Sequence, residues 1–464
     1  MKINCLRPTA LLIVIMLFIF GFCLASASSS IMHPLVGDIG DDYATVQILP
    51  DEDAMLYISY ATSDSKTNTT DKYEISAGEV LNVKLDGLIP DKEYSYVIHY
   101  AIDGSNIFLG KAEGSFHTQR GTGSSFVFTV QSDSHRDAMT DEALYRNTLK
   151  NILADKPDFH IDLGDTFMTE KFAKSEGEVI NRYLEDRRFF ETIGSSIPIY
   201  LANGNHEGEN GFLLVKGADS LAVWASNARN KYFINPSPGG IFEINASADK
   251  YAGMRGGYYA WEWGDVLFVV LDPFWNSLKK SGSLADNWNY SLGKDQYDWL
   301  KSVLAKSNAS FKFVFCHNLV GGLDKDARGG AEAAAYFEWG GKNADGSYGF
   351  DSKRNGWGEP IHNVLVEYGV DVVFHGHDHF YAEQELDGVI YQLVPQPGHP
   401  GTKDFKLPKE YGYQEGVFLP SSGHLRVSIS PEKAVVEYVA SRIGKPADGI
   451  GNMAVVHAYS ISPN

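Results

Sequence analysis

Five short polar clusters contain the side chains of this chain that are best suited to hold metal ions. The last cluster, Gly376 to His379, places two imidazoles two positions apart, directly after the apolar run 371–374. At the end of a strand this spacing points both rings the same way, and imidazole is a common ligand for zinc, iron and copper. The other four clusters are Asp133-Ser134-His135, Gly164-Asp165, Gly204-Asn205-His206-Glu207 and His317.

The positions of these clusters predict that they meet in space. Asp133, Asp165, Asn205, His317 and His377 each come a few residues after a predicted strand. Ligands of open α/β sheets bind beyond the carboxyl ends of the strands. We therefore interpret the chain as a scaffold that brings five loops to one place.

The ligand types favour a site for two metals. Two aspartates, one asparagine and four histidines form a hard-to-borderline ligand set, which suits zinc, manganese or iron better than a sulfur-loving metal. Seven ligands are too many for one metal with an open position. Two metals ~3.5–4 Å apart lower the pKa of a shared water and hold both oxygens of an in-line displacement. This chemistry cleaves phosphorus–oxygen bonds.

The elements that must position the clusters follow Ser125, where strands and helices alternate. The pattern predicts helices over 141–154, 179–190, 295–306 and 361–368. It predicts strands over 126–130, 159–163, 197–201, 311–316 and 371–374, and a hairpin of 258–262 with 266–271. The tail, with strands at 388–394, 425–429 and 435–439, lacks helices. The predicted fold class of the domain 125–464 is α/β with a β-rich end.

The sequence pattern of the preceding region, 31–118, predicts a small all-β sandwich. Period-two runs at 45–48, 55–60, 80–85 and 94–100 are separated by turn residues, with no helical period between them. The stretch Leu88 to Tyr94 resembles the tyrosine corner of fibronectin type III-like domains, in which the tyrosine bonds back to the upstream backbone. Residues 121–124 read as a linker to the second domain.

The order of the five clusters resembles that of the calcineurin-like metallophosphoesterase superfamily. With the sandwich in front, the chain is similar to purple acid phosphatases and their relatives. The resemblance implies a four-layer αββα fold in which two sheets pack face to face with helices outside. It also implies an enzyme that hydrolyses phosphoric esters with a dinuclear metal centre.

The resemblance implies a role for each residue. Asp133, His135 and His379 would bind the first metal; Asn205, His317 and His377 would bind the second; and Asp165 would bridge the two. His206 would hold the substrate phosphate and protonate the leaving oxygen as general acid.

One position departs from the purple acid phosphatase pattern. Those enzymes carry a tyrosine three positions after the bridging aspartate, and its phenolate on iron(III) gives the colour. Here that position is Met168. We therefore interpret the chain as a two-metal phosphoesterase without the purple iron site, and its metals as iron, manganese or zinc.

The N-terminus has the pattern of a secretory signal peptide. Lys2 and Arg7 precede an apolar run, and Ala25-Ser26-Ala27 supplies a cleavage site, which predicts removal of residues 1–27. The alternative is an uncleaved anchor. We expect a secreted or periplasmic protein with no stable membrane insertion after cleavage. Cleavage changes the formal charge from −19 to −21, which argues against binding to a nucleic-acid backbone.

The expected function is an exported phosphomonoesterase with a small-molecule phosphate ester as substrate. The same metal core also serves phosphodiesterases and nucleotidases, and a non-catalytic surface binding protein is a third alternative. Two long stretches, 204–255 and 319–358, read as irregular rims of the site; the second, rich in glycine and aromatic residues, is either a lid or a packed insertion.

Several neighbouring polar residues have two interpretations. Arg136 is either a phosphate contact or a solvated charge, and His160 with Asp162 are either strand residues or supports behind the ligands. Glu207 is expected to orient its neighbours. Cys316 is discounted as a nucleophile because it points to the opposite face from His317.

Overall fold

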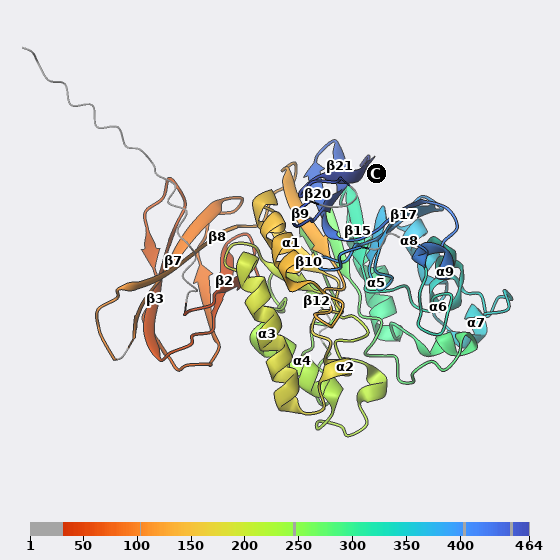
Figure 1. The fold of residues 1–464 in the computed structure, drawn as a ribbon, viewed down its shortest axis with the longest axis horizontal. Coiled ribbons are helices and arrows are strands. Elements are labelled where there is room, and N and C mark those ends of the chain that lie inside the picture. Colours follow the sequence, from red (N-terminus) through yellow and green to blue (C-terminus); the bar gives the residue numbers. More distant parts are fainter. Residues whose placement is uncertain (1–30, 103, 245–246, 402–404, 446–448, 464) are drawn as a thin grey trace, which may run out of the picture.

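The computed structural model describes residues 31–463 except 103, 245–246, 402–404 and 446–448. The predicted leader, 1–27, lies outside this part of the chain. No helix within the described residues is long and apolar enough to cross a bilayer. The chain forms a small all-β region followed by a larger α/β region, which stand side by side in Figure 1.

The N-terminal region is a sandwich of two antiparallel sheets, as predicted. Their strands are β1 (Leu35–Gly37), β2 (Tyr43–Ile48) and β6 (Leu81–Asp86) in one sheet, and β4 (Asn68–Thr69), β3 (Ala54–Ala61), β7 (Glu93–Ile102) and β8 (Gly110–His117) in the other, with β5 (Tyr73–Ile75) on β3. The tyrosine corner is confirmed, because the hydroxyl of Tyr94 accepts a hydrogen bond of 2.9 Å from the backbone N–H of Ile89. Tyr96 donates to the carbonyl of Ser195 in the second region, which links the two.

The α/β region is built on two mixed sheets. The first has the order β11 (Ile199–Leu201), β10 (Phe159–Asp162), β9 (Phe126–Gln131), β20 (Gly423–Ser430), β21 (Lys433–Ala440), β22 (Val455–Ile461). The second has the order β12 (Glu243–Ile244), β13 (Tyr259–Trp263), β14 (Val266–Val270), β15 (Phe311–Phe315), β16 (Val372–His375), β18 (Val389–Leu393), β17 (Tyr381–Leu386), β19 (Val417–Leu419). Strands β9, β10 and β11 are parallel, as are β14, β15 and β16.

Buried aromatic residues join the two sheets face to face. Phe128 of β9 lies edge-on to Phe268 of β14 at 5.1 Å between ring centroids and edge-on to Phe315 of β15 at 6.2 Å. Such apolar strands, buried on both faces, are typical of parallel sheets that are covered on both sides. The predicted four-layer architecture is confirmed.

Helices cover the outer face of each sheet (Figure 1). The first sheet is covered by α1 (Glu142–Asp155), α3 (Glu176–Gly194) and α4 (Leu221–Tyr232), and the second by α5 (Lys294–Lys306) and α8 (Ile361–Glu367). Helix α1 begins at Asp141, whose side chain accepts from the N–H groups of Ala143 and Leu144. Short helices α2 (Thr169–Phe172), α6 (Phe337–Gly340), α7 (Phe350–Lys353) and α9 (Leu407–Glu410) lie in the loops.

The structure corrects one sequence expectation about the loops and decides between two alternatives for the other. The stretch 204–255 is not irregular throughout, because it contains the three-turn helix α4. The stretch 319–358 is a packed insertion and not an aromatic lid: Phe337, Trp339 and Phe350 are fully buried.

Candidate metal centre

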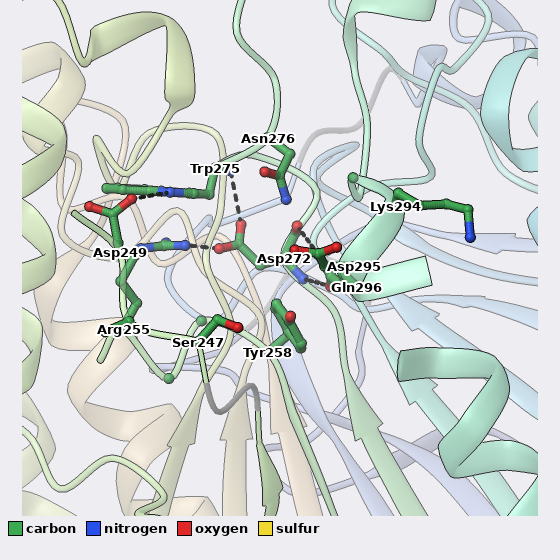
Figure 2. Close-up of a pocket in the computed structure, with 14 residues that line it drawn as sticks. Ser247, Asp249, Arg255, Tyr258, Asp272, Trp275, Asn276, Lys294, Asp295 and Gln296 are labelled. Atoms are coloured by element: carbon green, nitrogen blue, oxygen red, sulfur yellow. Dashed lines mark hydrogen bonds and ion pairs between the residues drawn. The ribbon is translucent and has the colours of Figure 1, made fainter. Parts of the chain in front are cut away.

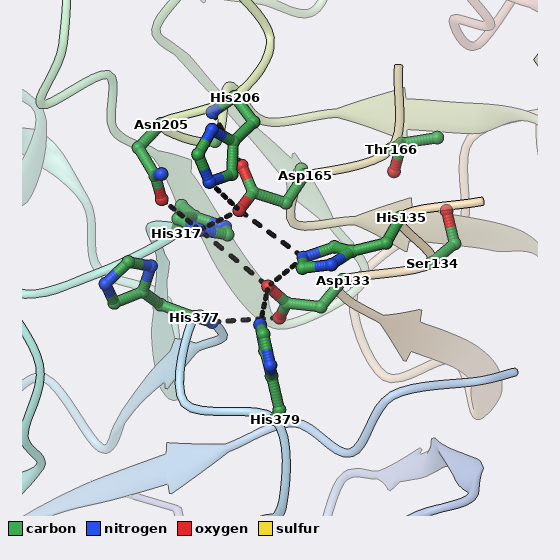
Figure 3. Close-up of polar contacts among 12 residues, drawn as sticks. Asp133, Ser134, His135, Asp165, Thr166, Asn205, His206, His317, His377 and His379 are labelled. Atoms are coloured by element: carbon green, nitrogen blue, oxygen red, sulfur yellow. Dashed lines mark hydrogen bonds and ion pairs between the residues drawn. The ribbon is translucent and has the colours of Figure 1, made fainter. Parts of the chain in front are cut away.

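The five predicted clusters lie together where the parallel strands of both sheets end (Figure 3). β9 leads to Asp133, β10 to Asp165 and β11 to Asn205 on one side, while β15 leads to His317 and β16 to His377 on the other. The face-to-face packing of the sheets therefore brings these loops to a common edge.

Two groups of side chains have the geometry of adjacent metal sites. One contains Asp133, His135 and His379 and the other contains Asp165, His317 and His377, with the ligand atoms of each group within 4.8 Å of one another. Asp133 Oδ1, His135 Nε2 and His377 Nδ1 are buried and have no hydrogen-bond partner. Buried polar atoms are normally paired, so these inward-facing atoms fit metal ligation. The Asp/His donor set fits zinc, manganese or iron.

Asn205 and His206 complete the centre. The Asn205 Oδ1 atom lies 3.0 Å from His317 Nε2, beside the second group. The backbone N–H of His206 donates to Asp165 Oδ1 at 2.7 Å, and its Nε2 lies 4.0 Å from Asp165 Oδ2. His206 is thus placed at the edge of the centre, with its ring nitrogen near the carboxylate that belongs to the second group.

Hydrogen bonds to backbone carbonyls fix which ring nitrogen of His317 and of His377 faces the centre. His317 Nδ1 lies 3.0 Å from the carbonyl of Leu163, and His377 Nε2 lies 2.7 Å from the carbonyl of Asp326. A nitrogen that bonds a carbonyl carries the proton, so the other ring nitrogen, Nε2 of His317 and Nδ1 of His377, faces the centre. His135 Nδ1 lies 3.5 Å from Asp137 Oδ2 in the same way.

The ligand loops adopt backbone conformations that are uncommon outside glycine. Positive φ angles occur at Asp133 (59°), His135 (55°), Asp165 (53°), His377 (78°) and His379 (67°). Left-handed conformations at non-glycine residues cost energy and concentrate at functional sites. Here they turn successive side chains of tight loops toward one point.

The buried aspartates are held in the charged form. Burial raises the pKa of Asp133 and of Asp165, but the charge of His317 and the charges of neighbouring histidines outweigh burial and bring both pKa values well below the usual range. The centre therefore presents two carboxylates to a cation.

Glu207 ties two ligand loops together. Its carboxylate accepts from the backbone N–H groups of Asp165 at 2.8 Å, Thr166 at 2.7 Å and Phe167 at 3.2 Å, and from that of Gly204. Burial raises the pKa of Glu207, the charge of Asp165 raises it further, and the N–H donors lower it. This geometry agrees with the expected orienting role.

A buried charge network supports the Asn205 loop, and Figure 2 shows one of its ion pairs, Arg255 with Asp272. Arg255 Nη2 donates to Glu209 Oε2 at 2.7 Å and to Asp272 Oδ2 at 2.8 Å, and Arg229 donates to Glu209 at 2.6 Å. Asn203, two positions before Asn205, donates a hydrogen bond of 3.3 Å to Asp272. A cavity of about 290 Å³ adjoins Arg255 and Asp272, whose charges are already paired with each other. We assign this network a structural role.

The neighbouring polar residues serve the scaffold. Arg136 pairs with Asp186 Oδ1 at 2.7 Å and covers the ring of Phe189, so its guanidinium anchors α3 and is not a solvated charge. Asp162 accepts from the N–H of Gly164 at 3.0 Å and supports the turn before Asp165. Cys316 is buried in the core, and burial raises the pKa of its thiol.

Three residues near the centre were not singled out from the sequence. Glu170 Oε2 lies 2.9 Å from His206 Nδ1, and Asp137 meets His135. His399 lines the same groove as His379 of the first group, and burial, followed by the charge of His379, lowers the pKa of His399. Glu170 and His399 follow no strand end and have no fixed spacing to a ligand, so only the position of Asp137, two residues after His135, offered a signal.

Comparison with known proteins agrees with this geometry. The family model for calcineurin-like phosphoesterases matches residues 126–381. Purple acid phosphatase 23 of Arabidopsis thaliana is 23% identical over 371 residues, which cover 75% of this chain and 65% of the relative. Purple acid phosphatase 15 of the same plant is 25% identical over 221 residues, covering 46% of this chain and 31% of the relative. This chain thus spans less than two thirds of either relative.

Two solved structures share the fold. The structure of PhoD superposes with a TM-score of 0.63 at 15% identity and covers 94% of this chain and 90% of its own. Purple acid phosphatase PPD1 from yellow lupin seeds superposes with a TM-score of 0.59 at 16% identity and covers 93% of this chain and 74% of its own. Since the matched family region, 126–381, takes up more than half of the chain and contains every candidate ligand, this protein belongs to the calcineurin-like phosphoesterase family.

Proposed function

We propose that this chain is an exported, metal-dependent phosphatase that hydrolyses phosphomonoesters. The observation that carries the proposal is the pair of Asp/His groups with His206 beside them. Similarity to proteins named purple acid phosphatases supports it. The leader-like N-terminus supports export.

In this proposal the ligands divide as the two groups do. Asp133, His135 and His379 hold one metal, and His317 and His377 hold the other. Asn205 would join the second set, and Asp165, whose Oδ2 lies 3.6 Å from His135 Nε2 and 3.3 Å from His317 Nε2, would be shared between the two sets. Bound there, two metals supply a water of lowered pKa and neutralise charge on the transferred phosphoryl group.

His206 has the position of a general acid. Its Nδ1 meets the carboxylate of Glu170, which can only accept, so the proton on Nδ1 is fixed. Protonation of the second nitrogen, Nε2, then gives a donor that faces the centre near Asp165 Oδ2. Such a donor protonates the leaving oxygen as the phosphorus–oxygen bond breaks.

Phosphodiester hydrolysis, by a phosphodiesterase or nucleotidase, is a second candidate. A groove beside His379 favours it, because the groove offers room for an organic group away from His206.

The test is turnover of a chromogenic phosphomonoester by the mature chain. The protein is stripped with a chelator and then reconstituted with manganese, iron or zinc, and metal content is measured in parallel. Metal-dependent turnover is expected. His206→Ala should bind two metals and lose about 10²–10⁴-fold in kcat. Asn205→Ala should also lose metal from the second site.

Tyr348→Ala provides the matched control, since Tyr348 is 58% exposed and touches neither metal group. Its turnover and metal content should equal those of the wild type. A protein that binds two metals yet hydrolyses no ester, or one that binds no metal at all, would contradict the proposal and favour a binding protein.

A further inference from the structure

A groove of about 570 Å³ opens beside His379. It lies on the side of the metal centre away from His206, since the two rings stand at opposite ends of the cluster in Figure 3. Neither His206 nor Asn205 lines it. The side chain of His379 is 36% exposed and forms part of its wall, so the groove is continuous with the centre.

The walls of the groove are mainly apolar. They include Met139, Phe405, Leu407, Tyr411 and Pro420. Phe405, Leu407 and Tyr411 pack on a buried cluster that contains Phe380 and Tyr413, so this wall is formed before any ligand arrives. Apolar clefts of this size, with a few polar groups, are typical of small-molecule sites.

The buried polar side chains of the groove are already engaged. Gln396 Nε2 donates to the carbonyl of Asp133 at 3.0 Å, and the Ser421 hydroxyl donates to the carbonyl of His379 at 3.1 Å. They hold the ligand loops and leave the apolar walls to face an occupant. His399, Lys406 and Glu410 also line the groove, and Lys406 and Glu410 are exposed with opposite charges. An occupant that matches the apolar walls is planar and apolar.

The two sides of the centre imply two organic groups. The group that departs must place its oxygen at His206, and a phosphomonoester has no other organic group. We propose that the His379 groove binds an aromatic, non-departing group of a phosphodiester, such as an aryl or nucleoside group, and that the enzyme hydrolyses such diesters in addition to monoesters. This inference rests on the proposed phosphoesterase function.

The reaction balances as a hydrolysis. A water molecule loses one proton and its oxygen forms a new bond to phosphorus, while the bond from phosphorus to the leaving oxygen breaks. The leaving oxygen takes the proton of His206 and departs as an alcohol. The product is a phosphomonoester whose aromatic group lies in the groove.

The test compares three esters that share one leaving group, p-nitrophenol: p-nitrophenyl phosphate, methyl p-nitrophenyl phosphate and phenyl p-nitrophenyl phosphate. For the reconstituted full chain, kcat/KM should be about tenfold higher for the phenyl diester than for the methyl diester, because only phenyl fills an apolar groove. Tyr411→Ala and Met139→Ala should each reduce this ratio toward one, because they lower kcat/KM for the phenyl diester more than for the methyl diester. Met139 is 68% exposed, so its substitution does not threaten folding.

Tyr348→Ala, the same aromatic deletion outside the groove, should keep the full ratio. Equal kcat/KM for the two diesters, or a phenyl preference that survives both groove variants, would overturn the inference. Monoester turnover without any diester turnover would also overturn it while the phosphatase proposal stands. No turnover of any of the three esters would overturn both.

Discussion

Glu170 and His206 meet at two points. The ring Nδ1 of His206 lies 2.9 Å from Glu170 Oε2, and the backbone N–H of Glu170 donates to the carbonyl of His206 at 3.1 Å. The bond to His206 is the largest cause that lowers the pKa of Glu170, so the carboxylate is charged at neutral pH. A short helix, α2, thereby holds the general-acid candidate from outside the metal ligands.

Glu170→Ala should impair the proton transfer without removing metal. We expect kcat for an alkyl phosphate, whose leaving oxygen needs a proton, to fall about 10–100-fold, and kcat for p-nitrophenyl phosphate to fall much less. Glu170→Gln, whose amide oxygen still accepts from Nδ1, should recover part of the loss. Steady-state kinetics with both esters and metal analysis measure these effects.

Lys280→Gln serves as the control for this pair. Lys280 contacts the other carboxylate oxygen of Glu170 at 3.6 Å and is 67% exposed, so its removal should change neither ester's kcat. An equal loss for both esters in Glu170→Ala would show that Glu170 supports the fold and does not position the acid.

Glu207→Gln should weaken metal binding although Glu207 is not itself a metal ligand. The amide has one acceptor oxygen in place of two, so some of the four N–H groups around Glu207 lose their hydrogen bonds. Each buried N–H left unpaired costs about 1–3 kcal/mol of stability. Because these N–H groups belong to the Asp165 and Asn205 loops, metal affinity should fall about 10–100-fold. Metal titration measures this affinity, and Glu52→Gln, a substitution of an exposed residue, is the control. Unchanged metal affinity in Glu207→Gln would show that Glu207 does not hold the two ligand loops.

Periodicity predicted most of the fold because the α/β core is regular. The strands that carry the ligands are apolar runs, and α5 shows a clear stripe at Leu300, Val303 and Leu304. Helix α4 gave no such signal: its buried face contains Ala222, Ala225 and Arg229. Small side chains and a buried arginine do not make a hydrophobic stripe.

Local spacing indicated the candidate metal ligands, but it did not indicate the residues that orient them. Each candidate ligand lies a few residues after a strand end, and this position is visible in the sequence. Glu170 reaches His206 only because the left-handed Met168 turns the chain into α2, across 36 positions of sequence. The Asp326 carbonyl reaches His377 across 51 positions. Tertiary folding creates both contacts, and no local pattern encodes them.

Acid should destabilise the protein in part through Glu209. Burial raises the pKa of Glu209, but the charges of Arg229 and Arg255 outweigh it and lower that pKa from 4.5 to about 2. A lowered folded-state pKa stabilises the fold fully above about pH 4.5, by roughly 3 kcal/mol, and this stabilisation is lost as pH falls toward 2.

Glu209→Gln should therefore lower the free energy of unfolding at pH 7 and reduce its decline between pH 4.5 and 2. Denaturant unfolding at a series of pH values measures both quantities, and exposed Glu52→Gln should reproduce the wild-type curve. If the free energy of unfolding of Glu209→Gln declined between pH 4.5 and 2 as steeply as that of the wild type, the stabilising role of Glu209 would be contradicted.

Iron should bind without giving a purple protein. The position that carries a tyrosine in purple acid phosphatases is Met168, which is fully buried and precedes α2 with a φ of 55°. Chain reconstituted with iron(III) should contain the metal by elemental analysis and lack the visible phenolate-to-iron absorption band. Zinc-loaded protein is the blank for this measurement. A strong phenolate-to-iron band in the iron form alone would show that a tyrosine reaches the metal centre.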